Sequence, residues 1–387
     1  MKRGPSGTFE STVSDNETVR AFVPSPLPPV PVFELTPLRQ RLLERALLAC
    51  GKLDGVSSLL PDPDLFLYAY VRREAVLSSQ IEGTQSSLSD LLLFEMEEVP
   101  GVPFDDVIEV SNYVAAMEHG LARLEGRDGG LPLSNRLLRE IHGKLLQKGR
   151  GSDKDPGEFR RTQNWIGGTR IGNAKFIPPP PQLVAECMAA LERYIHDPEV
   201  PALIKAALAH VQFETIHPFL DGNGRTGRLL IALILHQEGV LRQPLLYLSL
   251  YLKQHRDEYY RLLDLVRQEG DWEAWIDFIL EGIAQTANGA VDTAHRLLAL
   301  FAEDEKRIRE DSKLAGSALR AFSLLKSRPM ITIDGISKGA GMTYPTAAKA
   351  IETLGKLNIT QEMTGKPRNR IFAYARYLKI LNEGTQP

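Results

Sequence analysis

The sequence predicts a mainly α-helical protein with one short β-hairpin in its body and a small unit of helices and a basic hairpin at its C-terminal end. Three observations lead to this fold class. Apolar residues recur at spacings of three and four over most of the chain, as amphipathic helices require. Residues 158–181 are rich in β-favouring side chains and glycine. After residue 316, three short helical patterns precede a turn-rich basic segment.

The N-terminal third divides into an arm and a helical region. Residues 1–34 are polar at first and then proline-rich ("FVPSPLPPVPVF"), which favours an extended arm over a packed element. Residues 35–110 contain helical patterns over 38–53 and 65–81. We therefore expect a proline-rich arm followed by an N-terminal helical region.

Residues 111–300 are expected to form a helical core. Gly167, Gly168 and Gly172 interrupt β-favouring residues in "EFRRTQNWIGGTRIGNAKFIPPPP", so we interpret 158–181 as a β-hairpin flap on this core. The helical spacing predicts helices over 105–125, 133–148, 181–195, 202–216, 224–238, 255–268 and 272–302.

Residues 316–385 have the pattern of a winged helix. Helical patterns over 317–327, 332–339 and 343–357 precede "ITQEM", a turn "TGKPRNR" and "IFAYA". From residue 316 onward the chain has 11 Lys and Arg against 4 Asp and Glu, whereas the rest has 35 against 45. The third helix would be the recognition helix, with Lys366, Arg368 and Arg370 on the wing, so DNA is a candidate partner. Protein docking or dimerisation is the alternative.

Composition excludes several classes of protein. The chain of 387 residues is 43% hydrophobic and 25% charged, as expected of an ordinary globular protein with more than one domain. No run of about 18 apolar residues offers a membrane span, and the N-terminus lacks the apolar segment of a secretory signal. We therefore expect a cytoplasmic protein without a membrane partner. Cys50 and Cys187 match no disulfide framework or zinc spacing, and core packing is their expected role.

The segment "HPFLDGNGRTGR", residues 217–228, carries the strongest chemical signal. Its glycines allow successive backbone N–H groups to converge on an anion at the N-terminus of the following helix. Arg225 and Arg228 would lie on the first turn of that helix, where they could bind further phosphate oxygens. Asp221 is a hard oxygen ligand for Mg²⁺, and His217 is the nearby group able to accept a proton.

Each part of this segment also has an ordinary interpretation, as a plain turn, a structural histidine or solvated arginines. The segment is not a Walker A loop, because it lacks the Lys-Ser/Thr pair. His217 and Asp221 alone are too few ligands for a catalytic zinc.

The whole segment resembles the signature of the Fic family, H-x-F-x-[D/E]-G-N-G-R-x-x-R, at every defined position. The resemblance implies a Fic-type helical core that transfers AMP from ATP to a hydroxyl of a target protein. It implies that His217 deprotonates the target hydroxyl and that Asp221 holds Mg²⁺ against the α- and β-phosphates. The remaining signature residues would bind the nucleotide phosphates: Gly222, Asn223, Gly224, Arg225, Thr226, Gly227 and Arg228.

The resemblance assigns roles to two further segments. Residues 158–181 would be the flap whose exposed edge pairs with a target segment by strand addition. Tyr259 and Tyr260, in "KQHRDEYYRLL", are candidates for lining the nucleotide pocket, and aromatic core packing is their alternative. A homodimer is also implied by the resemblance.

The stretch "SSQIEG" resembles the family's inhibitory motif, [S/T]-x-x-x-E-[G/N]. Ser78 and Glu82 are four residues apart, so on a helix they share a face, and Gly83 can end that helix. The resemblance implies that Glu82 pairs with Arg228 and occupies the contact that the ATP γ-phosphate needs. The alternative is a surface or interdomain salt bridge worth at most about 1 kcal/mol.

Two other classes of function stay open at this point. The same fold could use another nucleotide donor, transfer phosphocholine or remove AMP, and a winged-helix DNA-binding regulator could carry an inactive Fic core. Neither the target protein nor the modified residue can be read from the sequence.

Overall fold

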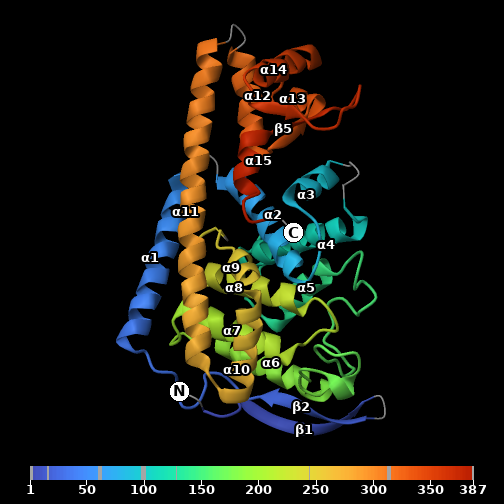
Figure 1. Ribbon diagram of the computed structural model, residues 1–387, viewed down its shortest axis with the longest axis vertical. Coiled ribbons are helices and arrows are strands. Elements are labelled where there is room, and N and C mark those ends of the chain that lie inside the picture. The colour runs from blue at the N-terminus through green and yellow to red at the C-terminus, as the bar shows by residue number, and fades with distance from the viewer. Residues whose placement is uncertain are drawn as a thin grey trace.

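The computed structural model describes residues 3–14, 17–59, 63–96, 102–127, 129–243, 245–311 and 315–385. It is mainly α-helical, as predicted. Helix α11 (Trp272–Asp311) runs along one side of the molecule, from the helical core to the C-terminal unit (Figure 1). With 40 residues it is about 60 Å long.

The N-terminal residues form a packed hairpin rather than the extended arm that the sequence predicted for 1–34. Strands β1 (Gly7–Ser14) and β2 (Glu17–Pro24) are antiparallel, with Gly7 opposite Pro24. Phe22 is 1% exposed and its N–H donates to Ile177 O at 2.8 Å. The hairpin forms because "ETVRAFVP" is β-favouring and buries apolar side chains against the core. The proline-rich residues 25–36 have no regular element, as expected.

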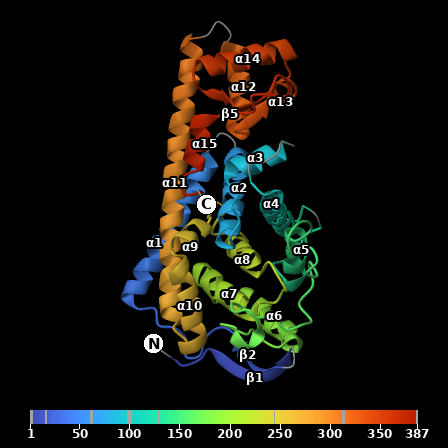
Figure 2. The ribbon, with the colours of Figure 1, turned by 45° about the vertical axis from the view of Figure 1, so that its right-hand side comes forward.

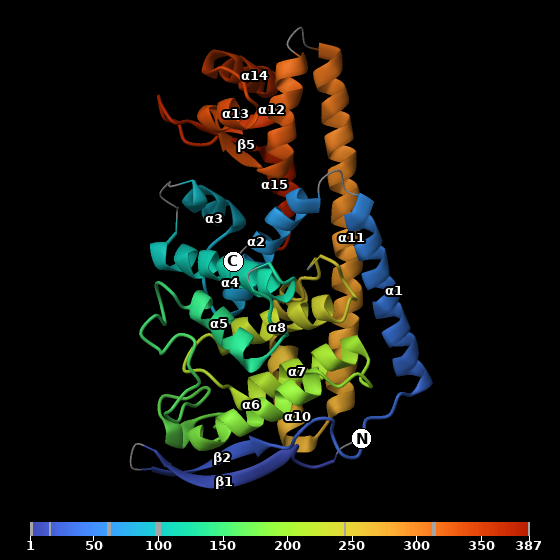
Figure 3. The same cartoon turned by 180° about the vertical axis from the view of Figure 1, so that it is seen from behind.

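Helix α1 (Pro37–Leu59) packs along α11, and Figure 3 shows the two helices side by side. Arg39 donates to both carboxylate oxygens of Asp277, at 2.7 and 2.9 Å, and so fixes one end of the pair. The N-terminal helical region is thereby joined to the longest helix of the chain.

The core is a group of helices around α7 (Ala202–Ile216), whose residues from Leu203 to Ile216 are all buried. Trp275 of α11 donates its indole N–H to Ala207 O at 2.8 Å. Figure 2 shows α4, α5 and α6 on the side of the core away from α11. The other core helices are α2 (Pro63–Ile81), α3 (Leu88–Glu95), α4 (Phe104–Leu124), α5 (Asn135–Leu145), α6 (Pro181–Ile195), α8 (Asn223–Gln237), α9 (Ser249–Gln254) and α10 (Arg256–Glu269).

The predicted flap turns back on itself but is not a two-stranded ladder. Ile166 and Phe176 face each other in one antiparallel bridge, with N–H···O distances of 2.8 and 3.1 Å. A short 3₁₀ helix (Ile171–Asn173) occupies the tip. Gly167 and Gly168 have positive φ, so the chain bends directly after Ile166 and a longer ladder cannot form.

The C-terminal unit has the three helices and the hairpin that the sequence predicted, with two further elements. A short strand, β3, pairs with β5 in the sheet order β3-β5-β4, and α15 leads the chain back to α2, beside which the C-terminal end lies (Figure 1). The elements in chain order are α12 (Ala315–Ser327), β3 (Met330–Thr332), α13 (Ile333–Gly339), α14 (Tyr344–Lys356), β4 (Thr360–Glu362), β5 (Ile371–Tyr374) and α15 (Ala375–Leu381).

Within the described ranges, no helix has the length and hydropathy needed to cross a membrane. Cys50 is buried and Cys187 half-buried, and both are free thiols.

Candidate functional site

The signature segment forms the turn between α7 and α8. His217 ends α7 in the left-handed conformation, with φ 50° and ψ 60°, and Gly222 precedes α8 with φ 74°. The side chain of Asn223 holds the turn closed, because its Oδ1 accepts from Phe219 N at 2.9 Å and its Nδ2 donates to Phe219 O at 2.8 Å. The left-handed conformation of His217 is uncommon for a residue other than glycine. Residues with such backbone conformations cluster at functional sites. The turn brings His217 and Asp221 to the same small pocket at the N-terminus of α8.

His217 is half-buried beside two arginines. Arg160 of the flap donates to His217 O at 2.9 Å, so the flap and the histidine are joined directly. Burial, Arg267 and Arg160 together lower the pKa of His217 to about 3. The imidazole is therefore neutral at physiological pH and able to accept a proton.

Asp221 presents an accessible carboxylate at the same turn. Its side chain is 37% exposed, and Oδ1 accepts from Gly222 N at 2.7 Å. Its backbone oxygen lies 2.9 Å from Nε2 of His142, a buried residue of α5. His142 Nδ1 accepts from Gly157 N, so Nε2 carries the proton and donates to Asp221.

Burial lowers the pKa of His142 to about 4, and its ring stacks on Phe219 at 3.7 Å. The neutral imidazole therefore fixes the backbone of the turn from behind. His142 was not predicted as a site residue. The sequence contains one indication of its role, because it is a polar residue on the apolar face of the helix in "REIHGKLL".

Arg225 is paired with an acid that the sequence analysis did not identify. Its Nη1 lies 2.9 Å from Oε1 of Glu109 on α4, and the two side chains are 1% and 3% exposed. The other oxygen of Glu109 lies 3.3 Å from Nη2 of Arg150, whose side chain is 55% exposed. Burial raises the pKa of Glu109, whereas Arg225 and Arg150 oppose that rise. Glu109 was detectable as a charged residue on the apolar face of 105–125.

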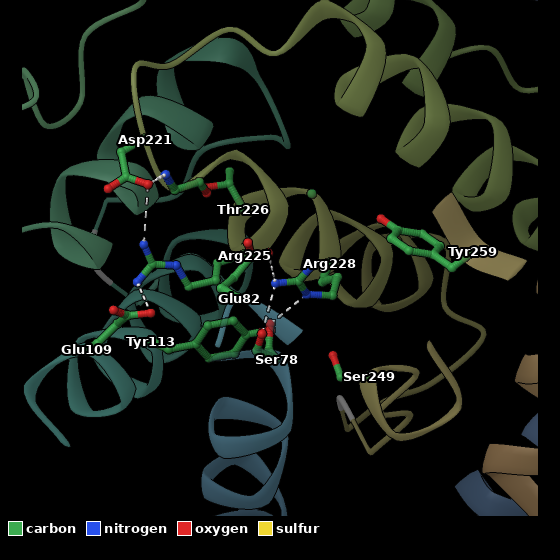
Figure 4. A network of polar contacts seen from close by, with 12 residues as sticks. Ser78, Glu82, Glu109, Tyr113, Asp221, Arg225, Thr226, Arg228, Ser249 and Tyr259 are labelled. Atoms are coloured by element: carbon green, nitrogen blue, oxygen red, sulfur yellow. Dashed lines mark hydrogen bonds and ion pairs between the residues drawn. The ribbon is translucent and has the colours of Figure 1, made fainter. Parts of the chain in front are cut away.

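Arg228 makes the contact with Glu82 that the sequence predicted. Its Nη2 lies 2.7 Å from Glu82 Oε1 and donates to Ser78 O at 2.9 Å, while Nε donates to Ser78 Oγ at 2.8 Å (Figure 4). Gly83 follows Glu82 with φ 99°, so the chain turns away just after the acid. Helix α2 thus delivers both predicted residues to one guanidinium.

The carboxylate of Glu82 occupies the N-terminal end of α8. A side chain at Gly224 would collide with Glu82 Oε1, so glycine is needed for this approach. Burial would raise the pKa of Glu82, but Arg228 and then Arg225 outweigh it, and the pKa lies below its ordinary value. An ionised carboxylate therefore occupies a position where a helix N-terminus and a buried arginine favour an anion.

The pocket at this position is small. Its volume is about 110 Å³, and Glu82, Arg150, His217, Asp221 and Gly224 are among its lining residues. Pockets for small-molecule ligands usually have about 300–1,000 Å³. With Glu82 in place, the pocket lacks the volume typical of a nucleotide site.

The other predicted residues make contacts within the protein that do not by themselves indicate a nucleotide site. Thr226 is fully buried and donates to Gly222 O at 2.9 Å, and the carbonyl of Gly227 accepts from His210 at 2.8 Å. Tyr259 is 1% exposed and its hydroxyl donates to His210 Nε2 at 2.9 Å, which is the core packing that the sequence left open. Tyr260 is 41% exposed. A nucleotide contact of either tyrosine stays a prediction.

Two family models match consecutive parts of the chain. The model "Fic/DOC family N-terminal" matches residues 40–122, and the model "Fic/DOC family" matches residues 132–235, which include the signature turn. Residues 40–122 and 132–235 therefore belong to the Fic/DOC family.

Curated relatives and solved structures agree with this membership. A protein adenylyltransferase Fic of Culex quinquefasciatus is 34% identical over 211 residues, 53% of this chain and 39% of the relative, and one of Aedes aegypti is 33% identical over the same length. The chain thus covers about two fifths of these relatives. A Fic family protein from Desulfovibrio desulfuricans has a TM-score of 0.57 at 19% identity, covering 88% of this chain and 97% of that one. The Fic fold therefore extends over most of the chain.

Proposed function

We propose that this Fic protein transfers AMP from ATP to a Ser, Thr or Tyr hydroxyl of a target protein, and of itself, and that Glu82 inhibits the transfer at rest. The observation that carries the proposal is the position of the Glu82 carboxylate, on Arg228 at the N-terminus of α8. The names of the curated relatives support the reaction class. Attack at phosphorus needs positioning, charge neutralisation and an activated oxygen, and the turn between α7 and α8 has groups for all three.

In this reaction His217 accepts the proton of the target hydroxyl while the hydroxyl oxygen attacks the α-phosphorus. The bond to the β-phosphate oxygen breaks, and pyrophosphate leaves. The backbone at Gly222 and Gly224, Asn223 and the two arginines would bind the phosphates. Arg150 adds a third guanidinium at the pocket, exposed enough to turn toward the leaving group.

Asp221 fits one Mg²⁺ ion. The described residues contain no cluster of three His, Cys, Asp or Glu that could hold a metal alone. A single accessible carboxylate beside a phosphate site is nevertheless the usual protein contribution to a Mg²⁺ ion that also binds substrate oxygens. When bound, the ion would neutralise phosphate charge.

Inhibition follows from competition for one position. Glu82 and a γ-phosphate are both anions that Arg228 can bind, and one guanidinium cannot pair closely with both. ATP that enters with Glu82 in place would hold its α-phosphorus out of line for attack. The target would present its hydroxyl at the 158–181 flap, whose Arg160 contacts His217 O.

The test is incubation with ATP labelled at the α-phosphate. Native protein should label itself weakly, Glu82→Gly strongly, and Glu82→Gly with His217→Ala not at all. The matched control is Glu125→Gly. Glu125 also ends a helix and precedes a glycine, but it pairs with Arg127 at the surface.

Two results would contradict the proposal. Glu82→Gly labelling no more than Glu125→Gly would exclude inhibition by Glu82. Labelling by the double variant would exclude His217 as the base. Competition by unlabelled GTP, CTP or CDP-choline separates AMP transfer from the use of another donor, and loss of label from a modified target in the presence of native protein indicates AMP removal.

A second candidate function is DNA binding by the C-terminal unit. Lys366, Arg368 and Arg370 are exposed on the β4–β5 connection, and Lys349 is exposed on α14. A gel shift with native protein and with the Arg368→Ala, Arg370→Ala variant tests this role. Tight DNA binding without any nucleotide transfer would favour a regulator with an inactive Fic core.

A homodimer and a cytoplasmic location stay predictions.

A further inference from the structure

A second cavity lies between helices α2, α9 and α11 and the residues that follow α15. Its volume is about 370 Å³, within the range of small-molecule sites. Leu77 of α2, Leu250 of α9 and Ala290 of α11 are among its apolar lining residues, and Glu383 and Gly384 close one side. The cavity is separate from the signature turn, because its lining includes no residue of 217–228.

Arg73 brings a buried positive charge to this cavity. The residue is 9% exposed, and its Nη2 donates to Glu383 O at 2.7 Å. Its Nε is buried without a hydrogen-bond partner, and none of the described carboxylates forms an ion pair with it. A buried cation without an anion is costly, so the site favours an anionic occupant.

The other charges of the lining do not satisfy Arg73. Arg296 and Glu383 pair with each other through two contacts of 2.6 and 2.7 Å at the cavity mouth. Asp292 is exposed, so water screens its carboxylate. Glu383 attracts Arg73 electrostatically, but its carboxylate is in contact with Arg296. The Arg73 guanidinium therefore has no carboxylate in direct contact among the described lining residues.

The walls around Arg73 are aromatic. The rings of Tyr70 and Tyr247 lie 5.4 Å apart, and the Arg73 guanidinium lies 5.7 Å from the Tyr70 ring. Tyr247 is 3% exposed, and its hydroxyl is buried without a hydrogen-bond partner. Tyr251 adds a third ring. A flat ring would pack against these side chains, and an acceptor atom on it would satisfy the Tyr247 hydroxyl.

We propose that this cavity binds a small aromatic carboxylate. Its carboxylate accepts a hydrogen bond from Arg73 Nε, and its ring lies among the three tyrosines and Leu77. A guanidinium suits a planar carboxylate because the N–H groups and the oxygens match in geometry.

The occupant would act on the helix that carries Glu82. Arg73 and Leu77 are on α2, nine and five residues before Glu82, and Arg73 also holds the segment after α15 through Glu383 O. A ligand that binds this arrangement stabilises it over any arrangement in which α2 has moved. The site thus strengthens the resting position of Glu82. Only this last step rests on the proposed function.

The experiment uses benzoate as the probe and neutral benzamide as its isostere. A ligand this small is expected to bind with a Kd of about 1 mM, measured by saturation-transfer NMR titration. Benzamide should bind at least about tenfold more weakly, and Arg73→Gln should weaken benzoate by a similar factor. Gly289→Leu fills the cavity, because Gly289 lines it and a Cβ there meets no atom within 4 Å.

Gly51→Leu is the matched control. Gly51 is also an exposed helical glycine with open space around its Cβ, but it lies on α1, away from the cavity. Benzoate should bind Gly51→Leu as it binds native protein and should not bind Gly289→Leu. It should also slow amide hydrogen exchange over residues 73–82 in native protein and in Gly51→Leu, but not in Gly289→Leu.

Three results would overturn the proposal. The first is that native protein binds no benzoate at a concentration tenfold above the expected Kd of about 1 mM. The others are that Gly289→Leu binds benzoate as well as native protein does, or that native protein binds benzamide as tightly as benzoate. None of these measurements uses ATP. A failed adenylylation assay therefore leaves this inference intact, and the reverse also holds.

Discussion

At the scale of single residues, the proposed inhibition depends on how firmly Arg228 is held. Ser78 supplies two acceptors and Glu82 one, and the burial of Arg228 and Ser78 strengthens the contacts between them. Glu82 and Arg228 shift each other's pKa, because Arg228 lowers that of Glu82, and Glu82 raises that of Arg228 against the effect of burial. The pair therefore stays ionised at any physiological pH.

Replacing Ser78 by alanine should partly release the inhibition. The change removes the acceptor of Arg228 Nε, a contact worth about 1.5–3 kcal/mol to a charged donor, while Glu82 stays paired. Self-labelling should rise several-fold over native protein but stay below that of Glu82→Gly. Ser79→Ala is the control, because Ser79 is equally buried and its Oγ has no hydrogen-bond partner among the described residues. Equal labelling by the two serine variants would contradict the assignment.

The low pKa of His217 predicts how the activity of the Glu82→Gly variant depends on pH. With a pKa of about 3, His217 is already deprotonated at pH 5.5, so protonation of this base should not reduce the rate in that range. Removing Glu82 lowers this pKa further, because Glu82 is one of the groups that raise it. For Glu82→Gly, kcat/KM for ATP should therefore stay level between pH 7.5 and 5.5. A decrease with a midpoint near the ordinary histidine pKa of about 6.5 would show that the base is not desolvated.

At the scale of secondary-structure elements, α2 is held in the core by a buried acid. Glu74 is 4% exposed and accepts from Tyr113 of α4 at 3.2 Å and from Ser249 of α9. Burial raises its pKa from 4.5 to about 7, against the opposing effects of Ser249 and Arg228. Glu74 thus joins three helices in its protonated form.

The raised pKa of Glu74 makes stability depend on pH. The folded protein binds this proton more tightly than the unfolded chain, so the contribution is complete below about pH 4.5 and is lost as the pH rises through about 7. Glu74→Gln keeps an acceptor but does not titrate, so it should lose less unfolding free energy than native protein between pH 5 and pH 8. Urea denaturation at both pH values measures the difference. Glu118→Gln, at a surface position of α4, should behave as native.

The elements differ in how far the sequence predicted them. Amphipathic helices such as α6 and α10 lie within one residue of their predicted bounds, because one periodic apolar face determines each. Helices α3 and α9 have only 8 and 6 residues and show too few turns for periodicity to be visible. The β1–β2 hairpin was missed because its burial depends on a contact with Ile177, more than 150 residues away.

The sequence predicted the site residues that lie close together along the chain. His217 to Arg228 form one continuous turn, and the resemblance to an inhibitory motif added Glu82. Glu109 and His142 were not found, because a single polar residue on a helix face does not say which distant group it contacts. The pairing of Arg225 with Glu109 is a property of how α4 packs near α8.

At the scale of the whole molecule, the C-terminal unit and the signature turn contact the same helix from different sides. After α15, the chain returns to α2, where Arg73 donates to Glu383 O and Gln80 donates to Thr385 O at 2.7 and 2.8 Å. Thr385 is 1% exposed. Helix α2 thus contacts both the C-terminal residues and Arg228.

Gln80→Ala should loosen α2 at its C-terminal turn. Gln80 Nε2 donates to Ser86 O and Thr385 O, and its Oε1 accepts from Lys253 at 2.7 Å, so the variant removes two buried contacts and one part-buried contact two residues before Glu82. Each buried contact is worth about 1 kcal/mol, and the amides of residues 78–83 should therefore exchange at least about tenfold faster. Self-labelling with native Glu82 should rise in parallel. Gln85→Ala is the control, because Gln85 is exposed in the following loop. If amide hydrogen exchange rises but self-labelling does not, the mobility of α2 does not limit the transfer of AMP. The contacts between the C-terminal residues and α2 then have no effect on the site.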